Sequence, residues 1–271
     1  MDRRLTPANG RVAFQGMEVP PPGVRLVPGQ NMRITQPVVD LCAAPAGARD
    51  KQMLLGQGFT MLDIHDGWAF GFDPVDDYVG YLPQEVIAQA ESPTHRLAVR
   101  QSHIYPQPDF KSREMASLSF LSELEVVGEV GRFAELASGG FVPLQHVEPL
   151  SWVAADAVTV AESFLGTPYL WGGNCGSGID CSGLVQLALW AAGRACPRDS
   201  DMQESLGADI DGALQRGDLL FWKGHVAMVV DENRIIHANA HHMAVAYEGI
   251  DAAIIRIEAQ GDGPVIARRR L

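Results

Sequence analysis

The chain has 271 residues, of which 46% are hydrophobic and 20% charged, with a formal net charge of −12. This length fits two or three small domains, and the composition is that of a globular protein with a buried core. Because an acidic surface repels phosphate groups, neither nucleic acid nor an anionic membrane is an expected partner.

The first part of the chain, residues 1–30, is rich in proline and shows little periodicity of apolar residues. We interpret it as an extended arm that packs on, or drapes over, the domain behind it. No apolar segment of signal-peptide type follows the N-terminal charges, and the chain has no stretch of about 18 apolar residues. From this pattern we expect a cytoplasmic protein.

The next part, from about residue 31 to residue 150, is predicted to form short strands between Gly, Pro and Asp turns. Two segments, 58–83 and 124–143, each show alternating apolar and polar residues followed by a turn signal. Each segment ends in Gly, an aromatic residue, an aliphatic residue and Pro. A repeat of about 60 residues with several short strands predicts two small all-β barrels in tandem. The repeats resemble bacterial SH3-like (SH3b) domains, and we place them at 31–90 and 91–150.

The pattern changes after Pro149. Helical spacing of apolar residues predicts one helix within 154–166 and a second, strongly apolar helix over 182–192. Three later segments alternate like strands: 218–222, 225–230 and 234–240. Helices followed by an antiparallel sheet describe an α+β domain, which we place at 151–271. The arginines at 268–270 are expected to form a solvated tail.

Cys181 stands where a Gly-rich loop enters the second helix. The unpaired N–H groups and the partial positive charge of a helix start favour a thiolate there. A thiolate attacks carbonyl groups, whereas a buried neutral thiol does not. Without partners, a packed core cysteine is the alternative interpretation.

Two histidines can supply those partners. Residues 231–233 are a turn signal, and a three-residue loop there would pair Ala227 with His237. His225 and His237 would then be diagonal neighbours on one face of the hairpin, about 7–8 Å apart. A two-residue loop would place them on opposite faces. A thiol, a base and a group that orients the base make an activated nucleophile.

Together these motifs resemble those of the NlpC/P60 peptidases. They occur in the family's order between about residues 155 and 240: Tyr-x-Trp-Gly-Gly from Tyr169, Asp-Cys-Ser-Gly-Leu from Asp180, Arg-Gly-Asp at 216–218, Gly-His-Val-Ala at 224–227 and Ile-His-Ala at 236–238. The resemblance implies a papain-like α+β catalytic domain preceded by two small all-β SH3-like barrels. It also implies that Cys181 is the nucleophile, His225 its base and His237 the residue that orients the base.

The reaction implied by the resemblance is acyl transfer without a metal or cofactor. Tyr169 and the backbone N–H of Cys181 would stabilise the oxyanion, while His225 protonates the leaving amine and later activates water. Zinc bound by Cys175, Cys181, His225 and His237 is the alternative. Cys175 departs from the family's usual pattern, and it is either incidental or part of a redox-protective disulfide.

The resemblance further implies a substrate, the bond between D-γ-glutamate and the diamino acid of murein stem peptides. With SH3b domains present, the chain resembles enzymes that recycle such peptides when their L-Ala amine is free. An anionic group must hold the ammonium; Asp180 fits, and it can also cap the Cys181 helix. The resemblance adds three further residues to the amine pocket: Ser182, Ser200 and Tyr78, with Tyr81 as the next choice for the tyrosine.

Three other functions remain open. A wall endopeptidase could use the SH3b pair to hold intact peptidoglycan, but it would need export. A non-catalytic wall-binding or scaffold protein would not need Cys181, His225 and His237. An acyltransferase would use the same thioester with a different acceptor. The sequence leaves open the identity of the diamino acid, the oligomeric state, and whether the barrels bind a ligand.

Overall fold

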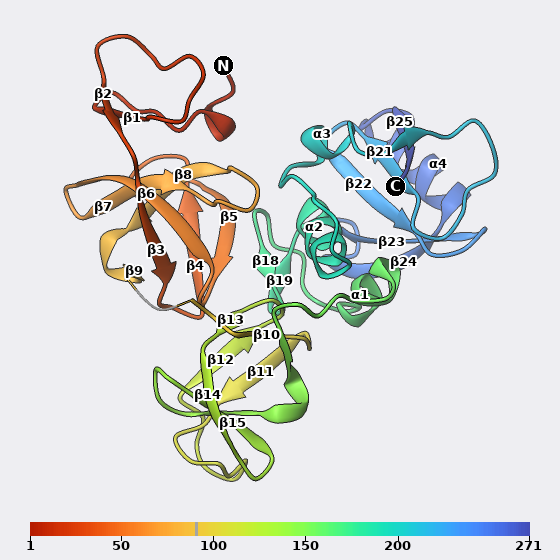
Figure 1. Ribbon diagram of the computed structural model, residues 1–271. Coiled ribbons are helices and arrows are strands. Elements are labelled where there is room, and N and C mark those ends of the chain that lie inside the picture. The colour runs from red at the N-terminus through yellow and green to blue at the C-terminus, as the bar shows by residue number, and fades with distance from the viewer. Residues whose placement is uncertain (90–91) are drawn as a thin grey trace. The chain divides into compact units, whose positions relative to one another are not determined.

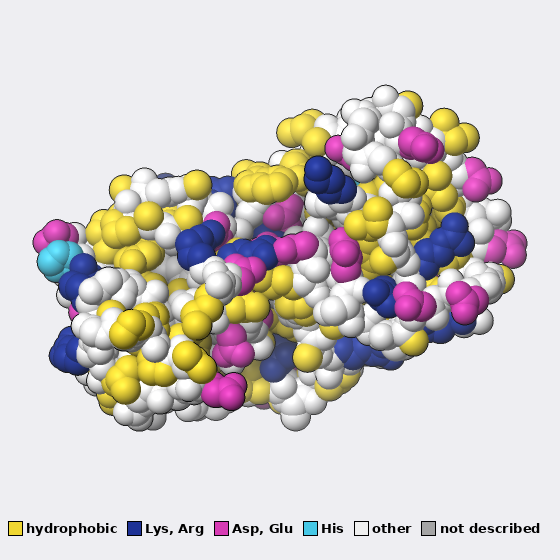
Figure 2. Space-filling view, turned by 90° about the horizontal axis from the view of Figure 1, so that it is seen from above, with side chains coloured by type: hydrophobic (Ala, Val, Ile, Leu, Met, Phe, Trp, Pro, Cys, Tyr) yellow, Lys and Arg dark blue, Asp and Glu magenta, His cyan; other side chains and the backbone are white. Residues whose placement is uncertain are grey.

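The computed structural model describes residues 1–89 and 92–271, and it divides into two compact units, Met1–Leu150 and Ser151–Leu271 (Figure 1). The predicted boundary between the two barrels, at residues 90 and 91, lies outside the described residues. Among the described residues, no helix combines the length and apolar character needed to cross a bilayer. Acidic and basic side chains are interspersed on the face drawn in Figure 2.

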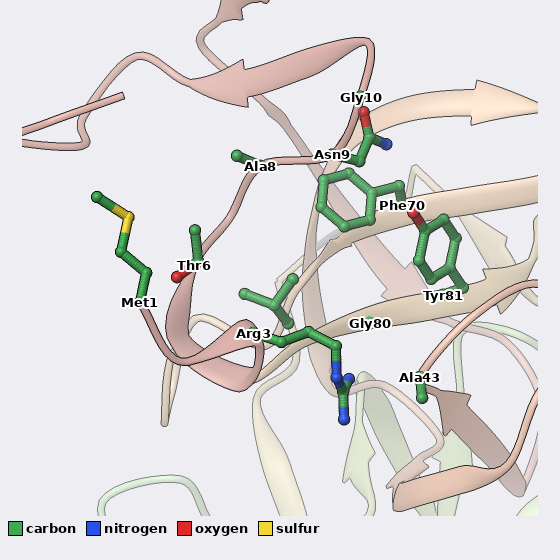
Figure 3. A pocket seen from close by; sticks show the side chains of 11 residues that line it. Met1, Arg3, Thr6, Ala8, Asn9, Gly10, Ala43, Phe70, Gly80 and Tyr81 are labelled. Atoms are coloured by element: carbon green, nitrogen blue, oxygen red, sulfur yellow. The ribbon is translucent and has the colours of Figure 1, made fainter. Parts of the chain in front are cut away.

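The N-terminal arm packs on the first barrel. It contains a 3-10 helix, η1 (Arg3–Leu5), and two parallel strands, β1 (Val12–Phe14) and β2 (Arg25–Val27). Val12 is fully buried and joins a core cluster with side chains of the barrel: Leu62, Phe70, Phe72 and Val79. Arm residues such as Asn9 face the barrel's Phe70 and Tyr81 across a small hollow (Figure 3). The arm is therefore part of the first unit's core.

A seven-stranded sheet forms the first barrel, in the order β5-β4-β8-β7-β6-β3-β9. Its elements are β3 (Gln30–Ile34), β4 (Val38–Cys42), β5 (Arg49–Leu54), β6 (Gly58–His65), β7 (Trp68–Phe72), β8 (Val79–Pro83), η2 (Gln84–Val86) and β9 (Ile87–Ala88). The β6-β7 hairpin turns at Asp66 and Gly67, which both have positive φ, as a two-residue hairpin turn requires.

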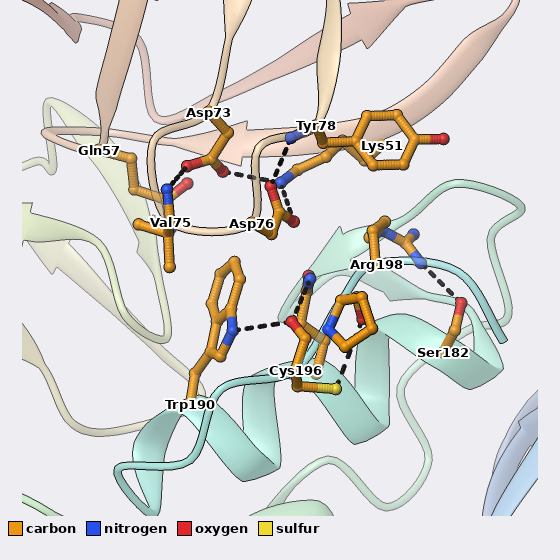
Figure 4. Close-up of polar contacts among 12 residues, drawn as sticks. Lys51, Gln57, Asp73, Val75, Asp76, Tyr78, Ser182, Trp190, Cys196 and Arg198 are labelled. Carbon is orange, nitrogen blue, oxygen red and sulfur yellow. Dashed lines mark hydrogen bonds and ion pairs between the residues drawn. The ribbon is translucent and has the colours of Figure 1, made fainter. Parts of the chain in front are cut away.

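The loop between β7 and β8 is fixed by buried ion pairs (Figure 4). Lys51 Nζ lies 2.7 Å from a carboxylate oxygen of Asp73 and 2.7 Å from one of Asp76. The same carboxylates accept hydrogen bonds from the backbone N–H groups of Val75 and Tyr78. Because buried charges persist only when they are paired, these contacts hold the loop that contains Tyr78 in one conformation.

The second barrel consists of three small sheets, β13-β10-β17, β11-β12 and β14-β15-β16. Its elements are β10 (His95–Leu97), β11 (Gln101–Ile104), β12 (Ala116–Ser119), β13 (Glu123–Leu124), β14 (Val126–Val130), β15 (Phe133–Leu136), β16 (Phe141–Pro143), η3 (Leu144–His146) and β17 (Val147–Pro149). Its ending, a strand followed by a 3-10 helix and a short strand, repeats β8-η2-β9. The prediction of two small barrels is confirmed.

The second unit combines helices with a six-stranded sheet in the order β20-β25-β21-β22-β23-β24. The helices are α1 (Ala157–Ser163), α2 (Cys181–Ala191), α3 (Ser200–Gln203) and α4 (Ile250–Gln260). The sheet strands are β20 (Ala208–Asp209), β21 (Leu219–Trp222), β22 (His225–Val229), β23 (Arg234–Asn239), β24 (Ala244–Gly249) and β25 (Ala267–Arg270), and a separate hairpin joins β18 (Asn174–Cys175) to β19 (Gly178–Ile179). The predicted α+β class is confirmed.

The C-terminal arginines do not form a solvated tail, so that expectation was wrong. They lie in β25, which pairs with β21 and β20. Arg269 forms an ion pair with Asp209, and Arg270 forms one with Asp218. The partners of Arg269 and Arg270 are carboxylates far away in the sequence, so the residues around the arginines give no sign of this pairing.

Candidate active site

Cys181 is the first residue of α2, where the sequence places it. Asp180 is the N-cap, and its Oδ1 accepts a hydrogen bond of 2.7 Å from Gly183 N. Position 183 requires glycine, because a Cβ there would lie 2.7 Å from the carbonyl oxygen of Gly173. The loop that contains Gly173 therefore packs closely on the start of the helix that carries Cys181.

The thiol is neutral in the free protein. Cys181 is only 6% exposed, and burial, followed by the charge of Asp180, raises its pKa to about 12. The backbone N–H groups of Val226 and Ser182 donate to the sulfur and act in the opposite direction. The helix start therefore does lower the pKa of the thiol, but desolvation raises it by more. The expectation that Cys181 rests as a thiolate is wrong.

His225 and His237 lie on one face of the β22-β23 hairpin. The ladder pairs Val229 with Ile235, and Val230 N donates to Arg234 O, which makes 231–233 the three-residue loop that the sequence predicts. The distance from His225 Nε2 to His237 Nδ1 is 2.9 Å. Val226, whose N–H contacts the thiol, directly follows His225. The thiol therefore lies at the start of β22, the strand that carries His225, and His225 is joined to His237.

Both imidazoles are neutral at neutral pH. Burial, with a further contribution from His237, lowers the pKa of His225 to about 3. Burial also lowers the pKa of His237. A neutral imidazole can take the proton of a neutral thiol as the sulfur attacks, which is the task of a general base.

Two residues not singled out from the sequence join these histidines. His237 Nε2 lies 3.1 Å from Glu248 Oε2. Arg256 clamps the same carboxylate, with Nε 2.8 Å from Oε1 and Nη2 2.7 Å from Oε2. Strand alternation could have suggested Glu248, because the ladder pairs Ile235 with Glu248 and so places Glu248 diagonally from His237 on one face.

Asp180 and Ser182 are held next to the nucleophile by Arg198, another residue not singled out from the sequence. The Arg198 side chain is fully buried and donates to both oxygens of Asp180, at 2.9 and 2.7 Å. It also donates to Ser182 Oγ at 2.8 Å (Figure 4). Asp180 therefore fulfils the capping role, and its charge is balanced by a buried guanidinium.

The remaining predicted residues lie in three places. Tyr169 is half-buried, and burial followed by the charges of Cys181 and Asp180 raises its pKa, so the phenol stays a donor. Ser200 begins α3 and is buried in a segment that Gln203 connects to Ser182 O through a hydrogen bond of 3.0 Å. Tyr78 belongs to the first unit, where its ring lies 5.7 Å from Lys51 Nζ.

The cysteines and histidines bear on the question of a metal or a disulfide. All four cysteines are free thiols, and Cys175 Sγ lies 3.1 Å from Ser177 Oγ. Side chains of His237, His242 and Glu248 bring potential ligand atoms within 4.8 Å of one another. Because Arg256 already neutralises Glu248 and both nitrogens of His237 have hydrogen-bond partners, we assign this cluster to a hydrogen-bond chain rather than to a metal.

The low pKa of His225 predicts that acid destabilises the fold. Between about pH 6.5 and about pH 3 the unfolded chain binds a proton at this residue and the folded chain does not. The free energy of unfolding therefore falls as the pH is lowered through this window. From pH 6.5 to pH 5, urea titrations of the wild type should show a loss about 1–2 kcal/mol larger than those of His225→Gln. An equal loss in both proteins would contradict the assignment of a half-buried, neutral His225.

Comparison with known proteins agrees with this geometry. Residues 166–256 match the model of the NlpC/P60 family, and residues 41–87 match that of the bacterial dipeptidyl-peptidase SH3 domain. A gamma-D-glutamyl-L-lysine dipeptidyl-peptidase of Bacillus cereus is 30% identical over 227 residues, which cover 71% of this chain and 68% of the relative. Dipeptidyl-peptidase 6 of Lysinibacillus sphaericus is 37% identical over 99 residues, 35% of this chain and 36% of its own length.

Among solved structures, an NlpC/P60 family protein of Bacillus cereus ATCC 10987 is similar with a TM-score of 0.71 at 20% identity. The match covers 89% of this chain and 99% of that chain. At this level of identity, the likeness shows a shared fold, which extends over the barrels as well as the catalytic unit.

Proposed function

The chain belongs to the NlpC/P60 family of cysteine hydrolases, and from this we propose that it hydrolyses the γ-D-glutamyl–diamino acid bond of murein stem peptides whose L-Ala amine is free. The observation that carries the proposal is that Cys181 begins α2 and accepts from the N–H of Val226, next to His225 at the start of β22, in a chain that also matches a dipeptidyl-peptidase SH3 domain. The proposal includes recycling of murein peptides as the role and the cytoplasm as the compartment.

The proposed reaction proceeds through a thioester. As Cys181 Sγ attacks the γ-carbonyl carbon of D-Glu, its proton passes to His225, and Tyr169 and the backbone N–H of Cys181 donate to the oxyanion. When the C–N bond breaks, His225 gives that proton to the amine of the diamino acid. Water then attacks the thioester, with His225 again accepting the proton, and releases L-Ala-D-Glu and the free thiol.

Recognition of the free amine is proposed to involve Asp180, Ser182 and Ser200. The charge of Asp180 is already balanced by Arg198, so an incoming ammonium needs further acceptors, which the hydroxyl groups of the two serines would supply. The contribution of Tyr78 stays a prediction from the sequence. A peptide with a free L-Ala amine has already been detached from whatever acylated that amine, which agrees with a recycling role.

Amine dependence is the sharpest test of this substrate. We expect L-Ala-γ-D-Glu-diaminopimelate to yield L-Ala-D-Glu, and its N-acetylated form to react at least about 100-fold more slowly, because a buried acceptor site rejects a group that cannot pair with it. Mass spectrometry of the products measures both rates, and the L-lysine analogue identifies the preferred diamino acid. Equal cleavage of the free and acetylated peptides would instead support an endopeptidase of intact peptidoglycan.

A further inference from the structure

Glu248 is connected to the base through His237. In the β23-β24 ladder, His237 pairs with Ala246 and Ile235 pairs with Glu248, so Glu248 lies on the face of the sheet that carries His237. Its Oε2 atom is 3.1 Å from His237 Nε2, and on the other side of that ring Nδ1 is 2.9 Å from His225 Nε2. The three side chains therefore form one continuous chain of hydrogen bonds.

The carboxylate fixes which nitrogen of His237 is protonated. The side-chain hydrogen bond from Arg256 holds the pKa of Glu248 well below its usual range, so Glu248 can only accept. His237 Nε2 must then carry the proton. Because burial keeps His237 neutral, its Nδ1 has a bare lone pair and accepts.

The same logic fixes the tautomer of His225. Its Nε2 must donate to the bare Nδ1 of His237, so in a neutral ring Nδ1 is unprotonated. A base needs this bare nitrogen to take a proton from Cys181. We propose that Glu248, clamped by Arg256, is a positioning residue that sets the tautomers of both histidines and thereby prepares His225 Nδ1 as the base. The inference rests on the proposed function of Cys181 and His225.

Glu248→Leu tests this inference because it removes both acceptor oxygens from a side chain of similar size. Gln is not the right substitution, because Arg256 Nη2 and His237 Nε2 share Oε2, and an amide oxygen at that position still accepts from both. In Glu248→Leu nothing holds the proton of His237 on Nε2. His225 then no longer has to donate from its Nε2, and the bare lone pair on its Nδ1 is no longer secured.

The first readout is the ¹⁵N spectrum of histidine-labelled protein, which distinguishes the two neutral tautomers without any substrate. In the wild type we expect His237 with a protonated Nε2 and a bare Nδ1, and in Glu248→Leu a substantial fraction of the other tautomer. A wild-type His237 protonated on Nδ1, or the same single tautomer in both proteins, would overturn the inference. Because this readout needs no turnover, it stays informative even if the proposed substrate is wrong.

The second readout is kinetic. We expect Glu248→Leu to lower kcat by about 10-fold or more with little change in KM, because losing the fixed tautomer depletes the base and not the binding site. Glu248→Asp, which keeps an accepting carboxylate, should recover part of the rate. The matched control is Glu162→Leu, which removes a carboxylate that pairs with Arg216 at 3.0 Å and accepts from Tyr247 at 2.9 Å, away from the histidines. Full activity of Glu248→Leu, or equal losses in the two Leu variants, would contradict a positioning role.

Discussion

Replacing Cys181 by alanine is expected to lower peptide hydrolysis by about 10⁴-fold or more while leaving the fold intact. The nucleophile and its base act as one unit, so removal of the sulfur leaves only the binding and oxyanion groups, whose residual effect is small. The substitution deletes one buried atom at the start of α2, where Asp180 still caps the helix. The rate of product formation and the urea midpoint measure the two effects separately.

The matched control is Cys42→Ala, which removes a sulfur atom from a cysteine outside the candidate active site. Cys42 is a buried free thiol in β4 of the first unit, so Cys42→Ala should keep full activity. If Cys181→Ala still hydrolysed the peptide at a comparable rate, neither the thioester route nor the acyltransferase alternative would stand.

Replacing Arg198 by methionine is expected to lower the free energy of unfolding by about 3–5 kcal/mol. The guanidinium is fully buried and pairs with both oxygens of Asp180, so its loss leaves a nearly buried carboxylate without its counter-charge. Asp180 also caps α2, and the thiol lies at that helix start; activity should therefore fall together with stability. Urea titration of the wild type and Arg198→Met measures the change.

Two further variants separate the ion pair from its surroundings. Arg234→Met makes the same substitution at an ion pair with Asp231 in which the two side chains are 52% and 38% exposed, and it should lower the free energy of unfolding far less than Arg198→Met does. The double variant Asp180→Asn, Arg198→Met should be more stable than Arg198→Met alone, because no unpaired charge remains. A loss at Arg198 no larger than that at Arg234 would contradict the structural role assigned to this pair.

The sequence predicted those features that depend on local patterns. The turn signal at 231–233 predicted His225 and His237 on one face if the loop had three residues and on opposite faces if it had two. The structure has the three-residue loop, and the two imidazoles meet. The start of α2 at Cys181 followed from the Gly-rich loop and the apolar run behind it. The α+β class and the repeated barrels followed in the same way.

Features that depend on distant partners were missed. The sequence showed no sign that helix α4 would bring Arg256 to Glu248, or that Arg198 would be buried against Asp180. The predicted protonation state of Cys181 was wrong for a related reason. The sequence shows that Cys181 begins a helix, but it does not show how deeply the thiol is buried, and burial outweighs the effect of the helix start on the pKa. The arginines of β25 likewise depend on carboxylates about 50 to 60 residues away.

The most direct test of the central claim is to identify the bond that is cut. Purified protein is incubated with the stem tetrapeptide L-Ala-γ-D-Glu-L-Lys-D-Ala, with Cys181→Ala in parallel, and the products are identified by mass spectrometry. We predict L-Ala-D-Glu and L-Lys-D-Ala from the wild type and intact tetrapeptide from the variant. Cleavage at another bond, or an intact tetrapeptide with both proteins, would contradict the claim.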